Sequence, residues 1–266
     1  MAGRNVLIQA SLATILAYVM QCAHLPRKIL DGLDRVNKNF LWGTSEATRK
    51  VHWVGWHKVT KPKDRGGLGL QIARGRNIAL LAKLNWRLYN EKDALWEKVL
   101  DAKYCTRRRW NSSNADGLPS SRIWVAIKKG REVFRKGSRW MVGKDSKISF
   151  WYGNWTKKGP IRQLIQGPLT QEALTLEIKN VIQDSGWNWS KLSFDFPLDY
   201  KLMLQAIPIS FLGRGCDRLS WVENPKGIFY LKSAYGIAMG DDTSMPFNAY
   251  WIWKLKTLPR IQFFLW

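Results

Sequence analysis

The stretch that decides the fold runs from Ile72 to Tyr104 and reads IARGRNIALLAKLNWRLYNEKDALWEKVLDAKY. Its apolar residues recur at intervals of three and four, the spacing that places side chains on one face of a helix. The first series comprises Ile78, Leu81, Ala82, Leu84 and Leu88, and a second runs through residues 95–100. Polar residues at 90–93 interrupt the pattern, so the stretch predicts two helices separated by a short break.

Two more helices are predicted upstream of this stretch. Helical spacing governs residues 4–22, Pro26 ends that helix, and residues 29–41 resume the pattern. The apolar positions of the first are Val6, Leu7, Ala10, Ala13, Ala17 and Met20, and those of the second are Ile29, Leu33, Val36 and Phe40.

The apolar run from Val6 to Ala23 also imitates a signal peptide or a marginal membrane span. Gln9, Ser11 and Thr14 interrupt the run, which favours a buried amphipathic helix over both alternatives. A secreted, tryptophan-rich protein stays open as an alternative, and it would need cleavage after residues 22–23.

The rest of the chain predicts loops and a small amount of strand. Residues 43–70 are rich in Gly, Lys and Trp and predict a loop or short strands, residues 111–121 form a clear loop, and residues 123–134 a short helix. Residues 140–151 predict a β-hairpin that turns at 143–146. Residues 218–222 and 227–231 predict extended segments around a turn, followed by a helix with Ser233 as N-cap.

These elements predict a mainly α fold with a small β component, of the α+β class. We divide the chain into a helical, basic segment at 1–110, a mixed α/β region with β-hairpins at 111–215, and an incomplete C-terminal module at 216–266. The composition, 45% hydrophobic and 24% charged, is that of a globular protein rather than a disordered tail.

The charge of the chain indicates an extended anionic partner. The formal net charge is +23, and residues 1–140 hold 28 basic and 10 acidic side chains against 15 and 10 in residues 141–266. Nucleic acid, RNA or DNA without sequence specificity, is the expected partner, and an anionic membrane surface is the weaker alternative. Basic residues that merely solvate exposed faces are the simplest reading that stays open.

Cysteine and histidine positions predict neither a disulfide framework nor a metal site. Cys22, Cys105 and Cys216 lie more than eighty residues apart, and no acidic or thiol companion accompanies His52 and His57. We therefore expect reduced thiols, an intracellular protein of the nucleus or cytoplasm, and no cofactor bound to this chain.

Two motifs that could suggest catalysis are weak. Asp241 and Asp242 are adjacent carboxylates of the kind that bind Mg²⁺ in polymerases, but residues 243–246, Thr-Ser-Met-Pro, favour a solvated loop over a strand. The glycines of Gly66-Gly-Leu-Gly69 lack the following Lys-Ser/Thr of a phosphate cradle, so they predict a backbone feature rather than a nucleotide site.

An ordered set of short motifs makes the sequence more specific than its periodicity. In order, they are Ala2-Gly-Arg-Asn-Val-Leu-Ile, Leu25-Pro, Asn39-Phe-Leu-Trp-Gly43, His52-Trp-Val-Gly-Trp56, Lys61-Pro with Gly66-Gly-Leu-Gly69, Asn77 to Lys83, Trp86-Arg87, Leu95-Trp96 and Lys103-Tyr104. The series continues with Lys136-Gly137, Trp140-Met-Val-Gly143, Ile148-Ser-Phe-Trp151, Asn154-Trp155, Asp217 with Trp221, Gly227 with Ser233-Ala-Tyr235, and Trp251-Ile-Trp253 with Phe263-Phe-Leu-Trp266. This set resembles plant LINE-type (non-LTR) retrotransposon reverse transcriptases over nearly the whole chain.

The resemblance implies a thumb-like segment after the polymerase palm, a connecting region, and the start of a reverse transcriptase zinc-binding domain. In that family the palm carboxylates precede the Ala-Gly-Arg motif, and the zinc-binding Cys and His residues follow the Phe-Phe-Leu-Trp motif. A ribonuclease H domain often lies still further downstream. The resemblance therefore implies that the Mg²⁺ and Zn²⁺ sites lie outside this chain, and we expect a segment that binds nucleic acid without RNA-directed DNA polymerase activity.

Candidate site residues follow from charge and from aromatic side chains next to it. The expected phosphate contacts are Lys58, Lys61, Lys63, Arg65, Arg74, Arg76, Arg107, Arg108 and Arg109. The candidates for stacking on bases are Trp53, Trp56, Trp86 and Trp110, although most tryptophans are expected in the core. An inert pseudogene product and a host-adopted protein-interaction module stay open as alternatives.

Overall fold

The computed structural model describes residues 1–45, 47–48, 50–105, 120–165, 167–183, 186–192, 196–207, 217–240 and 250–266. Helices dominate it and strands are few and short, which confirms the predicted α-rich fold with a small β component. The chain forms two compact units, one made of residues 1–134 with 231–266 and the other of residues 135–230. The three-part division drawn from the sequence stays a prediction.

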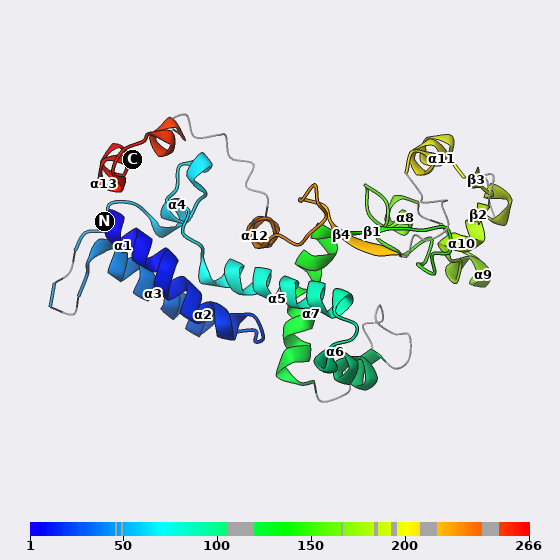
Figure 1. Ribbon diagram of the computed structural model, residues 1–266, viewed down its shortest axis with the longest axis horizontal. Coiled ribbons are helices and arrows are strands. Elements are labelled where there is room, and N and C mark those ends of the chain that lie inside the picture. The colour runs from blue at the N-terminus through cyan, green and yellow to red at the C-terminus, as the bar shows by residue number, and fades with distance from the viewer. Residues whose placement is uncertain are drawn as a thin grey trace. The chain divides into compact units, whose positions relative to one another are not determined.

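The first unit is helical (Figure 1). Its elements before residue 135 are α1 Ala2–Leu7, η1 Ile8–Leu12, α2 Ala13–Met20, α3 Arg27–Trp42, α4 Trp56–Val59, η2 Lys63–Arg65, α5 Ala73–Asn90, α6 Leu95–Leu100, η3 Asp101–Cys105 and α7 Arg122–Gly137. The last of these, α7, ends in the second unit. The C-terminal elements of the first unit are α12 Leu231–Met239, η6 Tyr250–Lys254 and α13 Pro259–Leu265. The predicted helices at 4–22, 29–41 and 123–134, and the pair at 72–104, are confirmed. Among the described residues, every helix is too short or too polar to cross a bilayer.

The buried faces of the first two helices differ from those predicted. The first helix includes a π-helical turn, η1, which buries Ile8, while the predicted Val6 and Leu7 are exposed and the predicted Met20 is buried on α2. In α3 the exposed residues include Ile29 and Val36, and the buried ones are Leu30 and Leu41. Both faces of α3 carry apolar residues, so periodicity alone could not choose between them.

Helix α5 is the centre of the first unit. It is buried on most of its circumference, with Leu80 in a cluster with Met20 and Leu30, and Leu81 and Leu84 in another with residues of α6 and α7. A helix that is apolar on several faces needs neighbours on each of them. Helices α2, α3, α7 and α12 supply those neighbours.

Buried asparagines join α5 to its neighbours. The side chain of Asn77 is fully buried, its Nδ2 donates to the carbonyl oxygens of Met20 at 2.8 Å and Ala23 at 2.9 Å, and its Oδ1 accepts from the Leu25 N–H at 3.1 Å. One amide therefore satisfies three backbone groups of the turn that follows α2. Two turns further along α5, Asn85 Nδ2 donates to the Ile127 carbonyl of α7 at 2.9 Å.

The N-terminal end of α5 is held by side chains from α3 and α12. Asp34 Oδ1 accepts from the Ala73 N–H at 3.1 Å, and the Tyr235 hydroxyl accepts from the Ile72 N–H at 3.0 Å. These contacts satisfy N–H groups that a helix start leaves without intrahelical partners. Burial raises the pKa of the Asp34 carboxyl above its ordinary value, although the hydrogen bond from Ala73 lowers it.

The second unit surrounds an aromatic core. Its elements are β1 Ser138–Met141, α8 Ile161–Leu164, α9 Gln171–Leu174, α10 Ile178–Val181, β2 Ile182–Gln183, β3 Gly186–Trp187, η5 Trp189–Lys191, α11 Leu198–Gln205 and β4 Arg218–Trp221. The core includes Phe150, Trp151, Trp155 and Phe196, and Trp187 stacks on both Trp155 and Trp189. These tryptophans are structural, as expected for most of them.

The β-hairpin predicted at residues 140–151 is wrong. The turn exists, because the Ser146 N–H donates to the Gly143 carbonyl at 3.3 Å, but β1 pairs antiparallel with β4. The returning segment pairs elsewhere, with the Phe150 N–H donating to Leu176 O and the Ile178 N–H to Ile148 O. A distant strand therefore took the place of the local partner, which a local turn signal cannot reveal.

Smaller differences concern the loop before α5 and the start of α12. Residues 43–70 contain the short helical turns α4 and η2 rather than strands. The helix expected from Ser233 begins two residues earlier at Leu231, so Ser233 lies inside its first turn and is not the N-cap. Of the expected extended segments, β4 forms at Arg218–Trp221, and the described residues 227–230 form no strand.

We predict that Asn77→Leu lowers the free energy of unfolding by more than about 2 kcal/mol, because it leaves three backbone groups without partners. Asn90→Leu, at the exposed end of the same helix, should change it by less than about 0.5 kcal/mol. Denaturant unfolding measures both variants. Equal losses at the two positions would show that the Asn77 hydrogen bonds contribute little.

We predict that Asp34→Asn stabilises the protein near neutral pH and that this gain fades in acid. The amide oxygen can still accept from the Ala73 N–H, while the cost of burying a charge is removed. Because the pKa of Asp34 is raised in the folded state, that cost is full above the raised pKa and absent below the ordinary value of the unfolded state. Unfolding of parent and variant across a pH series tests this, and Asp31→Asn on the exposed part of α3 is the control. A gain that grows in acid would contradict it.

Candidate nucleic-acid interface

The glycine loop between α4 and α5 has a defined backbone. The Leu68 N–H donates to the Val59 carbonyl at 2.9 Å, the Gly67 N–H to Pro62 O at 3.0 Å and the Gly69 N–H to Lys61 O at 3.0 Å. Leu68 is fully buried in a cluster with Ile8, Leu41, Val59 and Leu70. These contacts fix the loop against the first helix and α3.

Glycine is required at this loop for two reasons. Gly66 and Gly69 have φ values of 81° and 71°, in the left-handed region that favours glycine. At Gly67 a Cβ atom would lie 2.0 Å from the Lys61 carbonyl oxygen, which no real Cβ tolerates. The sequence prediction of a backbone feature at this motif therefore agrees with the geometry.

Four of the predicted basic residues lie together, Lys58 on α4 and the other three on this loop. Lys58 and Lys63 are exposed, and Lys61 and Arg65 are half-buried. Lys63 Nζ lies 4.7 Å from the centre of the Trp253 ring, and the Trp266 indole N–H donates to Gly66 O at 2.9 Å. The loop is therefore supported by the C-terminal residues, a relation that spacing in the sequence did not show.

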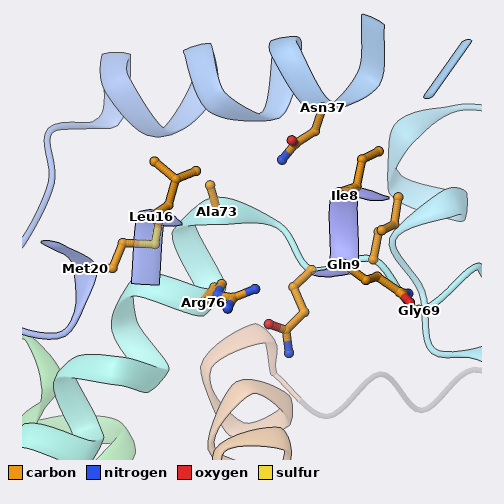
Figure 2. Close-up of a pocket in the computed structure, with 10 residues that line it drawn as sticks. Ile8, Gln9, Leu16, Met20, Asn37, Gly69, Ala73 and Arg76 are labelled. Carbon is orange, nitrogen blue, oxygen red and sulfur yellow. The ribbon is translucent and has the colours of Figure 1, made fainter. Parts of the chain in front are cut away.

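Arg74 and Arg76 follow at the start of α5 and point to different environments. Arg74 is exposed, whereas Arg76 is half-buried and lines a cavity of about 200 Å³ between the first helix, α3 and α5 (Figure 2). Burial lowers the pKa of the Arg76 guanidinium. A separation of two residues places side chains about 200° apart around a helix, which accounts for the difference.

Folding brings Lys129 of α7, a basic residue that was not among the predicted contacts, close to His24. The pKa of His24 is lowered by burial first, and then by repulsion from Lys129 of α7 and Arg74 of α5. Lys129 and Arg74 thus act on the same imidazole although they lie 55 positions apart. Only the packing of α7 against α5 could reveal this.

The predicted stacking residues differ in exposure. Trp53 is 83% exposed, Trp56 packs against the cluster around Leu41 and Val59, and Trp86 is half-buried on α5. Trp251, which is not among the predicted stacking residues, is 54% exposed. Arg107, Arg108, Arg109 and Trp110 lie outside the described residues, as do Asp241 and Asp242.

Within the described part of the chain, no three His, Cys, Asp or Glu side chains gather in a way that could hold a metal ion. The proposal for this surface therefore rests on charge and backbone geometry. The expectation that no cofactor binds this chain stays a prediction.

We predict that Gly67→Ala destabilises the protein by more than about 1 kcal/mol, because the added methyl group meets the Lys61 backbone. Gly32→Ala is the control, since a Cβ at that position in the middle of α3 meets nothing within 4 Å. It should stabilise by about 0.5–1 kcal/mol through helix propensity. Denaturant unfolding of both variants tests this prediction. If Gly67→Ala leaves the free energy of unfolding unchanged, the loop backbone can shift freely.

Comparison with known proteins places this chain among plant proteins. It is 33% identical over 276 residues to an Arabidopsis thaliana protein named "Putative ribonuclease H protein", a match that covers all of this chain and 44% of that relative. It is 30% identical over 139 residues to an uncharacterised mitochondrial protein of Arabidopsis thaliana, covering 52% of this chain and 90% of that relative. No family model and no solved structure matches the chain. The chain therefore belongs to the plant protein family that includes this mitochondrial protein, a kinship consistent with derivation from a retrotransposon.

Proposed function

We propose that this chain is a nucleic-acid-binding segment of a plant LINE-type retrotransposon reverse transcriptase, and that its first unit contacts the sugar–phosphate backbone. The observation that carries the proposal is the glycine loop, where Lys58, Lys61, Lys63 and Arg65 project from a backbone fixed by hydrogen bonds. Phosphate contacts from Lys and Arg position a protein on nucleic acid without reading its sequence.

The rigidity of this loop favours binding. Long basic side chains lose conformational freedom when they are ordered on a partner, but a fixed backbone carries no further ordering cost. The ring of Trp253 beneath Lys63 supports the aliphatic stem and orients its ammonium group. The loop therefore presents charge at defined positions, as a surface that tracks phosphates requires.

Further support comes from the electrostatics of the whole first unit. The excess of basic residues is concentrated in residues 1–140, and an unbalanced charge of this size repels itself unless an anionic partner neutralises it. Exposed Trp53 supplies an aromatic face that could stack on an unpaired base. Single-stranded or mixed nucleic acid is therefore the proposed target, without base specificity.

The names of the relatives fit this origin without assigning an activity to the chain. One relative is named for ribonuclease H, and polyproteins of the resembled family often carry such a domain after the region that this chain matches. The chain spans 44% of that relative's length. We propose a binding role for this segment, and any polymerase or nuclease activity would be a property of a longer protein.

We predict that the affinity for RNA or DNA falls steeply with salt, with a log–log slope of about −4 to −7 if about five to eight phosphates are neutralised. Replacing Lys61, Lys63 and Arg65 together by Gln should reduce the slope by about three. The control replaces the exposed Lys157, Lys158 and Lys226 of the second unit by Gln and removes the same charge. Fluorescence anisotropy with duplex and single-stranded targets across a salt series measures both.

The two triple variants separate a defined surface from a general charge effect. A smaller slope in the loop variant than in the control supports the proposal. Equal slopes in the parent and the loop variant, or a parent without salt dependence, would contradict it. A parent whose binding does not depend on salt would favour the alternative of a protein-interaction module.

A further inference from the structure

A cavity of about 200 Å³ lies at the N-terminal end of α5 (Figure 2). Leu16 and Met20 of α2 form part of its apolar wall, and Gln9, Asn37, Gln71 and Arg76 supply its polar lining. Figure 2 shows Arg76 of α5 among the lining residues, with Leu16 and Met20 on one side of it and Ile8 and Gln9 on the other. A cavity of this size has room for a small solute together with water.

The charge inside this cavity is unbalanced. Arg76 is the one charged residue among the residues that line it, and its Nε is buried without a hydrogen-bond partner in the described structure. No ion pair joins Arg76 to a carboxylate of the described residues. Asp34 of α3 faces the same end of α5, but its Oδ1 accepts from the Ala73 N–H.

Burying part of this guanidinium, with Nε unpaired, costs free energy. Taking a charge out of water costs free energy unless an opposite charge or several hydrogen bonds compensate, and buried charges in proteins are normally paired. The lowered pKa of Arg76 reflects the same cost of burial. An anion that entered the cavity would remove this cost.

We propose that this cavity binds a single phosphate group through the guanidinium of Arg76. The planar fork of Arg donates two parallel hydrogen bonds to a phosphate, and such charge-assisted bonds are stronger than neutral ones. The amides of Gln9, Asn37 and Gln71 offer further N–H donors on other sides of the cavity. Donors from several directions suit a tetrahedral phosphate better than a planar carboxylate, which the fork alone would satisfy.

The phosphate has two possible sources, a backbone phosphate of nucleic acid or a free or terminal phosphate. The inference deepens the proposed function in the first case but does not depend on the loop lysines. The proposal for the glycine loop and the proposal for the cavity can therefore fail separately. Variants of Lys61, Lys63 and Arg65 test the loop, and a variant of Arg76 tests the cavity.

The experiment measures binding of inorganic phosphate to the full chain by isothermal titration calorimetry at constant ionic strength, and thermal unfolding with and without phosphate. Arg76→Gln is the test variant, and Lys83→Gln, at an exposed position of the same helix, removes the same charge as a control. We expect Arg76→Gln to weaken phosphate binding about ten- to a hundredfold, the worth of one or two charge-assisted hydrogen bonds. Lys83→Gln should bind within about twofold of the parent.

Stability provides a second measurement that guards against misfolding. Without phosphate, Arg76→Gln should unfold at the same temperature as the parent or higher, because a half-buried charge whose Nε lacks a hydrogen-bond partner in the described structure is removed. With phosphate, the parent should gain stability and the variant should not. Absence of phosphate binding to the parent, or equal losses in Arg76→Gln and Lys83→Gln, would overturn the proposal.

Competition identifies the source of the phosphate group. An oligonucleotide without terminal phosphates is added to the phosphate titration of the parent. If the oligonucleotide displaces the phosphate that the parent binds through Arg76, the result supports a backbone phosphate in the cavity. Binding of phosphate that persists beside bound oligonucleotide supports a free or terminal phosphate.

Discussion

The first unit depends on the buried amide of Asn77. This side chain pairs with three backbone groups at and after the end of α2, so it determines where the first helix ends relative to α5. Met20 is then packed beside Leu30, Ala73 and Leu80. The position of α3 follows, because it leaves the same turn, and α3 in turn places Asp34 at the start of α5 and Asn37 in the cavity wall.

The elements that the sequence could predict are those whose signal is local. The apolar spacing of α5 and the polar break at residues 90–93 lie within a few turns of each other, so their interpretation needed no tertiary contact. The buried face of α3 could not be predicted, because polar Asp34 and Asn37 turn inward for reasons set by α5 and the first helix. The partner of β1 lies about eighty residues away, where local pairing rules carry no information.

The candidate site was predictable to a similar extent. Lys58 to Arg65 are neighbours in sequence, so their grouping on one loop required only the glycines that bend it. Arg74 and Arg76 look equivalent in sequence, yet the helix exposes one and places the other in a cavity. The nearness of Lys129 to His24, and of Trp253 to Lys63, depends on packing between segments far apart in the chain.

The pairing of β1 with β4 has a consequence for how this protein could change over time. Ser138 lies opposite Trp221, so the chain enters and leaves the second unit at adjacent positions of one small ladder. A segment whose two ends meet can be lengthened, shortened or exchanged while the flanking chain keeps its path. Residues 135–230 therefore have the architecture of an exchangeable insert, which could be lost or replaced in evolution while the helical unit that carries the basic loop keeps its fold.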